Sequence, residues 1–134
     1  MARSHSHTIP IRVRYNECDP MGVAHHTAYP VWFEMGRTEL LRTSHSAVPY
    51  RELETRGVFL AVVSLNVKYK RPARYDDELT LRTTLTDIGH VKIEHEYELL
   101  REGIILATGS TTLACLDRAG RPQPVPEVLR VSST

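Results

Sequence analysis

The chain has 134 residues and a formal net charge of +1, from 17 lysines and arginines against 16 aspartates and glutamates. This balance excludes a strongly basic nucleic-acid-binding domain and an acidic disordered tail. The length suits one domain with a single core, which we expect to span 1–134 with residues 1–7 disordered. Cys18 and Cys115 are too few for a disulfide framework. With no secretory leader and no apolar run long enough to span a bilayer, we expect a cytoplasmic protein.

The N-terminal third predicts a strand, a turn and the longest helix of the chain. Apolar and polar residues alternate over 9–16, which is typical of a half-buried strand. Asp-Pro followed by a glycine at 19–22 predicts a turn. Helical spacing of apolar residues begins near Thr27, the expected N-cap, and fades around 44–46. Gly36 costs about 1 kcal/mol relative to alanine inside a helix, so we expect close packing of this helix on a sheet.

The remainder of the chain is dominated by strand patterns. A short helix is predicted over 49–56, ended by Gly57. Beyond Val58 the apolar period becomes two, and turn residues separate four strand patterns, at 58–70, 79–86, 91–99 and 104–116. The last pattern is the most apolar, so we expect that strand to be central.

Tight turns join antiparallel neighbours, and they therefore predict the sheet type. The expected fold class is α+β, with a five-stranded antiparallel sheet wrapped around one long helix, the hotdog arrangement. One helix does not cover a sheet of this length, and its edge strands stay unpaired. We therefore expect a homo-oligomer, either a dimer or a tetramer of paired dimers.

A long ordered motif precedes and enters the predicted helix: Val13-Arg14-Tyr15-x-Glu17-x-Asp19-x-x-Gly22-Val23-x-x-His26-x-x-Tyr29, then Phe33-Glu34-x-x-Arg37-x-Glu39-x-Leu41-Arg42. Two further segments follow, Val67-x-Tyr69-x-x-Pro72-Ala73-x-Tyr75-Asp76-Asp77 and Pro122-x-Pro124-x-Pro126. Together they resemble the hydroxybenzoyl-CoA thioesterase family, in the branch of general acyl-CoA thioesterases that includes the Tol–Pal-associated enzymes. The resemblance covers residues 9–130.

The resemblance implies hydrolysis of a short-chain or aromatic acyl-CoA to free acid and CoA, with no cofactor and no metal. Asp19 matches the family's catalytic aspartate, which acts as general base on water or as nucleophile on the thioester carbon. His26 stands where the family's helix begins, so that its backbone N–H polarises the carbonyl. Gly22 matches the turn glycine, and residues 60–62 match the strand segment that lines the acyl tunnel from the partner subunit.

The residue types also fit thioester hydrolysis without reference to the family resemblance. Thioester hydrolysis needs an activated oxygen nucleophile, a donor for the developing oxyanion and an apolar slot. Asp19 can supply the first, and free N–H groups at a helix N-terminus the second. The CoA thiolate leaves readily near neutral pH, so a single carboxylate suffices without a Ser-His-Asp triad.

Other side chains are expected to bind substrate. These residues are Gly22, His25, Tyr29, Glu34, Leu60, Ala61, Val62, Lys70, Arg71, His90 and Lys92. His25 is expected to line the pocket or tune Asp19, whereas Glu34 either points into the cleft or pairs with Arg37 or Thr38 on a solvated face. CoA phosphates need cations, for which Lys68 and Arg74 are further candidates. The hydroxybenzoyl-CoA enzyme carries an arginine-rich turn where this chain has Gly-His-Val-Lys at 89–92.

Several alternatives stay open. Asp19 before Pro20 could simply start a turn, and Cys18 could act as nucleophile with His25 or His26 as base. The adjacent histidines suggest a metal, but they lack clear ligand spacing. At the level of function, a hotdog hydratase or dehydratase acting on acyl thioesters and a non-catalytic acyl-CoA-binding module are the alternatives.

Overall fold

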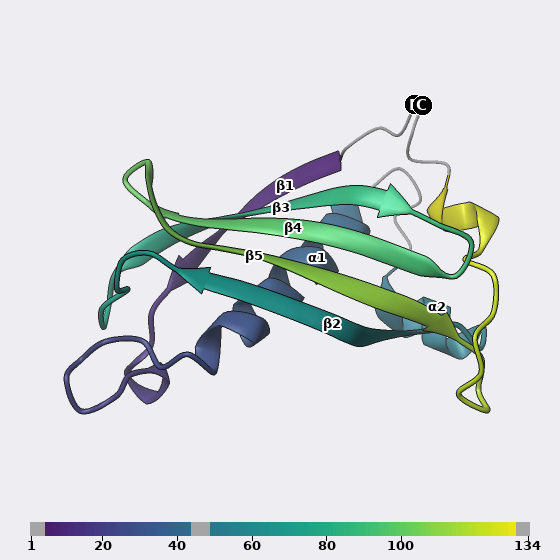
Figure 1. The fold of residues 1–134 in the computed structure, drawn as a ribbon, viewed down its shortest axis with the longest axis horizontal. Coiled ribbons are helices and arrows are strands. Elements are labelled where there is room, and N and C mark those ends of the chain that lie inside the picture. The colour runs from purple at the N-terminus through teal and green to yellow at the C-terminus, as the bar shows by residue number, and fades with distance from the viewer. Residues whose placement is uncertain (1–4, 44–48, 131–134) are drawn as a thin grey trace.

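The computed structural model describes residues 5–43 and 49–130. An antiparallel sheet of five strands, in the order β1-β3-β4-β5-β2, curls around the long helix α1 (Ala28–Thr43) (Figure 1). The strands are β1 (His5–Arg12), β2 (Phe59–Tyr69), β3 (Glu78–Ile88), β4 (Lys92–Arg101) and β5 (Ile104–Leu116). Three short helices complete the fold: η1 (Tyr15–Glu17), α2 (Tyr50–Thr55) and η2 (Glu127–Leu129). The predicted α+β arrangement is confirmed.

The position of β1 corrects two expectations about the N-terminus. His5 and His7 were expected in a disordered segment, but they pair with Leu85 and Thr83 of β3. Residues 1–4 lie outside the described part of the chain. The strand also ends at Arg12, earlier than predicted, because the Glu17 side chain bonds to the backbone at 14 and turns the chain into η1.

The order of the strands corrects a third expectation. β5 was expected at the centre because it is the most apolar strand. It lies inside the sheet between β4 and β2, but β4 occupies the middle, since β1 extends the sheet beyond β3. The edges are therefore β1, which pairs only with β3, and β2, which pairs only with β5.

Helix α1 packs on the concave face of the sheet at very short range. Trp32 and Phe33 are each 1% exposed, and the Phe33 ring stacks on Tyr97 with centroids 4.1 Å apart. A Cβ added at Gly36 would lie 2.7 Å from Leu81 Cδ2 and would overlap the Thr83 hydroxyl. Only glycine allows the helix this close to β3, which confirms the predicted close approach.

The molecule has two ends, which Figure 1 shows on its left and right. At the loop end, residues 13–27 dock on the β2–β3 connection (70–77): Ala24 N–H donates to Ala73 O at 2.7 Å. At the α2 end lie α2, the start of β2, the β3–β4 turn and residues 117–130. The 11 residues of β2 run from the α2 end to the loop end, roughly 35 Å in an extended strand.

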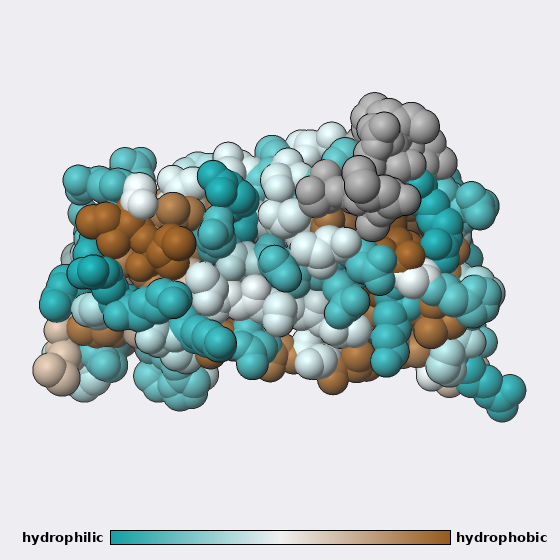
Figure 2. Space-filling model, turned by 45° about the horizontal axis from the view of Figure 1, so that its top comes forward, coloured by the Kyte–Doolittle hydropathy of each residue, from teal (hydrophilic) through white to brown (hydrophobic). Residues whose placement is uncertain are grey.

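The surface carries no large continuous apolar face in the view of Figure 2, where brown side chains gather in separate patches toward both ends. Among the residues described, no helix combines the length and apolar character needed to cross a membrane.

Candidate active site

Asp19 lies in a short loop between η1 and α1 that folds back on itself. Cys18 and Ala24 form an isolated antiparallel bridge, Asp19 N–H donates to Val23 O at 2.9 Å, and Gly22 N–H donates to Asp19 O at 2.9 Å. Gly22 has φ +78°, a left-handed conformation that favours glycine. The predicted turn is therefore present, with its glycine where the chain reverses.

The carboxylate of Asp19 is held by one oxygen only. Its Oδ1 accepts hydrogen bonds from Met21 N–H at 2.9 Å and from Val23 N–H at 3.3 Å. No described residue bonds to Oδ2, and the side chain is half-buried. Asp19 thus starts the turn and still presents one oxygen to a ligand, so that the structural and chemical interpretations of this residue are compatible.

The start of α1 offers a backbone donor beside this loop. Ala28 N–H donates to His25 O at 3.0 Å, and Thr27 N–H donates to His25 Nδ1 at 3.3 Å. Within 5–43 and 49–130, nothing accepts a hydrogen bond from His26 N–H. Thr27 precedes the first helical residue as expected of an N-cap, but its hydroxyl bonds to His25 Nδ1 at 2.9 Å. The positive end of the helix therefore keeps a free N–H at His26.

The side chains of His25 and His26 are exposed, with ring centroids 4.3 Å apart and planes tilted by 35°. Tyr69, at the end of β2, donates its hydroxyl to His26 O at 3.4 Å. Tyr29, which was expected to bind substrate, is only 2% exposed and packs edge-on against Tyr69 at 4.9 Å. Tyr29 therefore supports the start of the helix from within the core.

Glu17 connects the loop to the helix, and sequence reasoning assigned it no role. Its Oε2 accepts the Trp32 indole N–H at 2.9 Å, its Oε1 accepts Arg14 N–H at 2.8 Å, and its backbone oxygen accepts His25 N–H at 2.7 Å. The side chain is 9% exposed. The motif contains Glu17, but no local pattern separates it from a surface carboxylate, because Trp32 becomes its neighbour only when the helix packs.

Asp77 clamps the connection on which the loop docks. Burial alone would raise the pKa of its carboxyl, but hydrogen bonds from Arg74 N–H at 2.9 Å and from the Arg101 guanidinium at 2.8 Å bring that pKa below its ordinary value. The connection in turn holds the loop, since Tyr75 N–H donates to Gly22 O at 3.0 Å.

The geometry does not favour Cys18 as a nucleophile. Burial raises the pKa of its thiol, and the nearby Glu17 and Asp19 charges raise it further. Its Sγ donates to Arg14 O at 3.5 Å. A metal is not favoured by geometry either: in the described segments, no three His, Cys, Asp or Glu side chains cluster as ligands.

The remaining predicted residues divide between the two ends. Lys70 and Arg71 lie exposed at the loop end, where the N–H of each donates to Leu106 O, at 2.8 and 3.0 Å. Residues 60–62, His90 and Lys92 lie at the α2 end, so a single protomer does not bring them to Asp19.

Glu34 lies exposed on α1. It lines a shallow groove beside the edge strand β1, together with Met35 and Thr38. It makes no ion pair with Arg37, which is buried. Of the two expectations for Glu34, the pairing with Arg37 is therefore not observed in the described residues.

The chain is similar to known proteins both in sequence and in fold. A model of the thioesterase-like superfamily matches residues 13–131. The chain is 32% identical over 118 residues to the acyl-CoA thioesterase YbgC of Haemophilus influenzae, covering 88% of this chain and 85% of that protein. The hypothetical protein TT1821 from Thermus thermophilus superposes with a TM-score of 0.86 at 35% identity, covering 94% of this chain and 96% of that one. The DHNA-CoA thioesterase from Staphylococcus aureus gives a TM-score of 0.84 at 30% identity, over 89% of this chain and 80% of that one.

The matched segment contains the loop, the long helix and all but the first edge strand. The protein therefore belongs to the thioesterase-like superfamily and is a thioester hydrolase with the hotdog fold.

Proposed function

We propose that the protein hydrolyses short-chain or aromatic acyl-CoA to free acid and CoA. One observation carries the proposal. Asp19 Oδ2 and His26 N–H, neither of which has a hydrogen-bond partner among the described residues, belong to one loop, which Glu17 and Asp77 hold in place. The similar proteins from Haemophilus influenzae and Staphylococcus aureus, named as thioesterases of acyl-CoA and DHNA-CoA, support a CoA thioester as substrate.

Asp19 supplies the oxygen chemistry by one of two routes. As general base, Oδ2 takes a proton from water, the water oxygen attacks the thioester carbon, and the C–S bond breaks to release CoA as thiolate. As nucleophile, Oδ2 attacks the carbon itself, the C–S bond breaks to release CoA as thiolate, and water then hydrolyses the resulting anhydride to free acid and the Asp19 carboxylate. In both routes the His26 N–H donates to the developing oxyanion, which is typically worth on the order of 10²–10³ in rate.

A second copy of the chain completes the site in this proposal. Four large side chains of the edge strand β2 are exposed: Val62 is 46% exposed, Val63 56%, Leu65 44% and Tyr69 52%. An exposed apolar edge strand is suited to pairing with another strand. Two β2 strands related by a two-fold axis run antiparallel, which brings the α2 end of one protomer beside the loop end of the other. Residues 60–62, His90 and Lys92 of the second copy then approach Asp19, while Lys70 and Arg71 stay available to CoA phosphates.

The test is thiol release from a panel of acyl- and aroyl-CoAs by the Asp19→Asn variant. We expect kcat to fall by about 10²–10⁴-fold with the fold and oligomer unchanged. Asp87→Asn, at an exposed aspartate of the α2 end, is the matched control and should keep full activity. Survival of hydrolysis in Asp19→Asn would exclude this mechanism.

Two other outcomes would redirect the assignment. Hydration of crotonyl-CoA without thiol release would identify a hydratase. Saturable binding of acyl-CoA with no thiol release at any pH would identify a binding module.

A further inference from the structure

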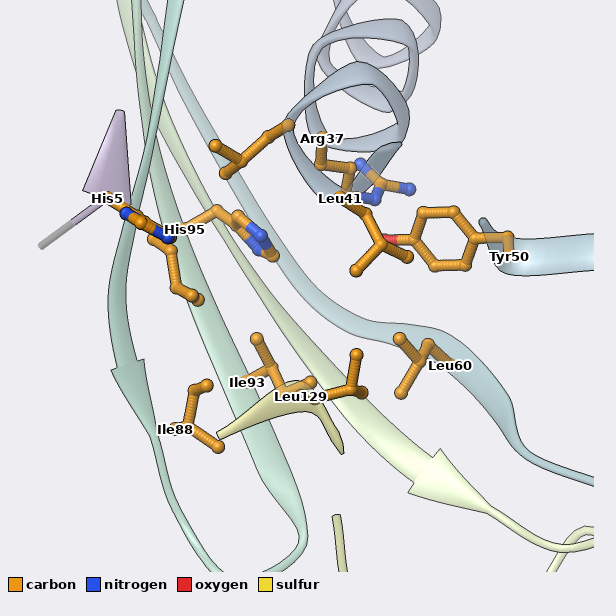
Figure 3. A pocket seen from close by; sticks show the side chains of 11 residues that line it. His5, Arg37, Leu41, Tyr50, Leu60, Ile88, Ile93, His95 and Leu129 are labelled. Atoms are coloured by element: carbon orange, nitrogen blue, oxygen red, sulfur yellow. The ribbon is translucent and has the colours of Figure 1, made fainter. Parts of the chain in front are cut away.

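A small cavity lies at the α2 end, between the C-terminal half of α1 and the sheet (Figure 3). Its volume is about 40 Å³, enough for about three water molecules. Leu60, Ile93 and Leu129 contribute to its apolar walls, and His5, Arg37, Tyr50 and His95 are the polar groups on its lining. None of these residues belongs to the loop that carries Asp19.

In the described part of the chain, Arg37 is a buried cation without a carboxylate partner. It is 8% exposed, its guanidinium donates to Tyr97 Oη at 3.4 Å, and the Tyr50 phenol lies beside it. No described aspartate or glutamate forms an ion pair with it. Since a guanidinium has five N–H donors and buried charges are normally paired, this group has unused capacity for an anion.

His95 faces the same cavity from β4 with an unused ring nitrogen. It is 5% exposed, and in the described part of the chain its Nδ1 has no hydrogen-bond partner. Burial and the nearby Arg37 charge lower the pKa of His95 to about 3, so the ring is neutral near pH 7. A neutral imidazole carries one N–H, which is available to donate at Nδ1 in that tautomer. Figure 3 shows the Arg37 and His95 side chains on the same side of the cavity.

We propose that this cavity binds a very small carboxylate, acetate or formate. The planar guanidinium of Arg37 matches a carboxylate in shape and charge, and His95 Nδ1–H can donate to the same group. The methyl group of acetate then lies against Leu60, Ile93 and Leu129. The size of the cavity excludes long acyl chains, and a single buried cation suits a monoanion better than a phosphate dianion.

Thermal unfolding of the intact protein tests this site with sodium acetate as the probe. Neutral acetamide and sodium chloride serve as comparisons, the chloride at equal ionic strength. At an acetate concentration near ten times the dissociation constant, we expect Tm to rise by about 4–6 °C. Arg37→Met should fold, because it removes an unpaired buried charge, and should lose the rise. The control Arg42→Met removes an exposed arginine that pairs with Glu39 at 3.6 Å, and it should keep the rise.

A second measurement needs no variant. The imidazole ¹⁵N signals of the unmodified protein should show one histidine whose Nδ1 shifts with acetate and not with acetamide. The proposal is overturned if acetamide or chloride stabilises as well as acetate, or if Arg37→Met keeps the rise in Tm. It is equally overturned if neither Tm nor any imidazole signal responds to acetate, since water then fills the cavity.

Discussion

The indole N–H of Trp32 donates to Oε2 of Glu17 at 2.9 Å, which joins the turn before the Asp19 loop to the second turn of helix α1. The same glutamate holds His25 N–H through its backbone oxygen. One buried carboxylate thus sets the position of the loop relative to the free N–H of His26.

We expect Glu17→Gln and Trp32→Phe each to destabilise the protein by about 1–3 kcal/mol, because each leaves a buried polar partner poorly satisfied. Urea unfolding of both variants and of the double variant measures their coupling, expected at about 0.5–3 kcal/mol. Because Glu17 acts as a positioning residue, Glu17→Gln should change kcat more than KM. Additive free energies of unfolding would show that the two side chains do not act as a pair.

Gly36→Ala should lower the free energy of unfolding by about 1–3 kcal/mol, although alanine is the better helix former. The reason is steric, since the new methyl group meets Leu81 and the Thr83 hydroxyl. Gly89→Ala is the control, because a Cβ there meets only Lys92 O at an ordinary 3.6 Å. Thermal and urea unfolding compare the two variants, and equal effects would contradict the close packing of α1 on β3.

The lowered pKa of Asp77 predicts a loss of folding stability in acid. Its pKa is lower in the folded protein than in the unfolded chain, where it is about 3.9. The stabilisation is therefore present above about pH 3.9 and is lost as the pH falls through the folded-state pKa. Asp77→Asn should be less stable at pH 6 and should lose less stability between pH 6 and 3. Exposed Asp76, changed to asparagine, should follow the parent curve of Tm against pH.

The lowered pKa of His95 predicts a separate loss of folding stability that begins at a higher pH than that of Asp77. Its folded-state pKa is about 3, because of burial and the nearby Arg37, whereas an unfolded histidine has a pKa of about 6.5. The unfolded chain therefore binds a proton that the folded protein does not, and stability falls as the pH drops from about 6.5 toward 3. Arg37, Tyr50 and His5 line the same cavity. Tm of His95→Gln should vary less over pH 6.5–4 than that of the parent, and an unchanged slope would contradict a neutral buried ring.

Pairing through β2 predicts complementation between inactive copies. Asp19→Asn lacks the proposed carboxylate, and Val62→Trp, at an exposed position of β2, should block the acyl slot that it provides to its partner. Each variant alone should have little activity, whereas a mixed dimer contains one intact site, so mixing should restore about a quarter of the parent rate if subunits exchange at random. A charge on the other edge, Thr8→Lys on β1, should leave activity unchanged. Failure of a co-refolded mixture to recover would show that Val62 serves its own protomer.

Much of the fold was predictable because it depends on local patterns. Period-two alternation identified the strands, and helical spacing located α1. Tight turns between the strands predicted that neighbours are antiparallel. One such turn is the Glu102–Gly103 pair, where φ is 50° and 80°. The motif also indicated Asp19 and the start of the helix. Strand order was less predictable, because apolar content reports burial and does not say which of the strands with two partners lies in the middle of the sheet.

By itself, the sequence determined the class of fold, the family motif, and the placing of a carboxylate seven residues before His26 at the helix start. Only the tertiary structure decided that Glu17 bonds to Trp32, that Tyr29 is buried, and that Leu60 and Asp19 lie at opposite ends of β2. It also placed Arg37 and His95 on one cavity. The physical reason is that these relations join residues from different elements, and their distances depend on how the helix packs against the sheet.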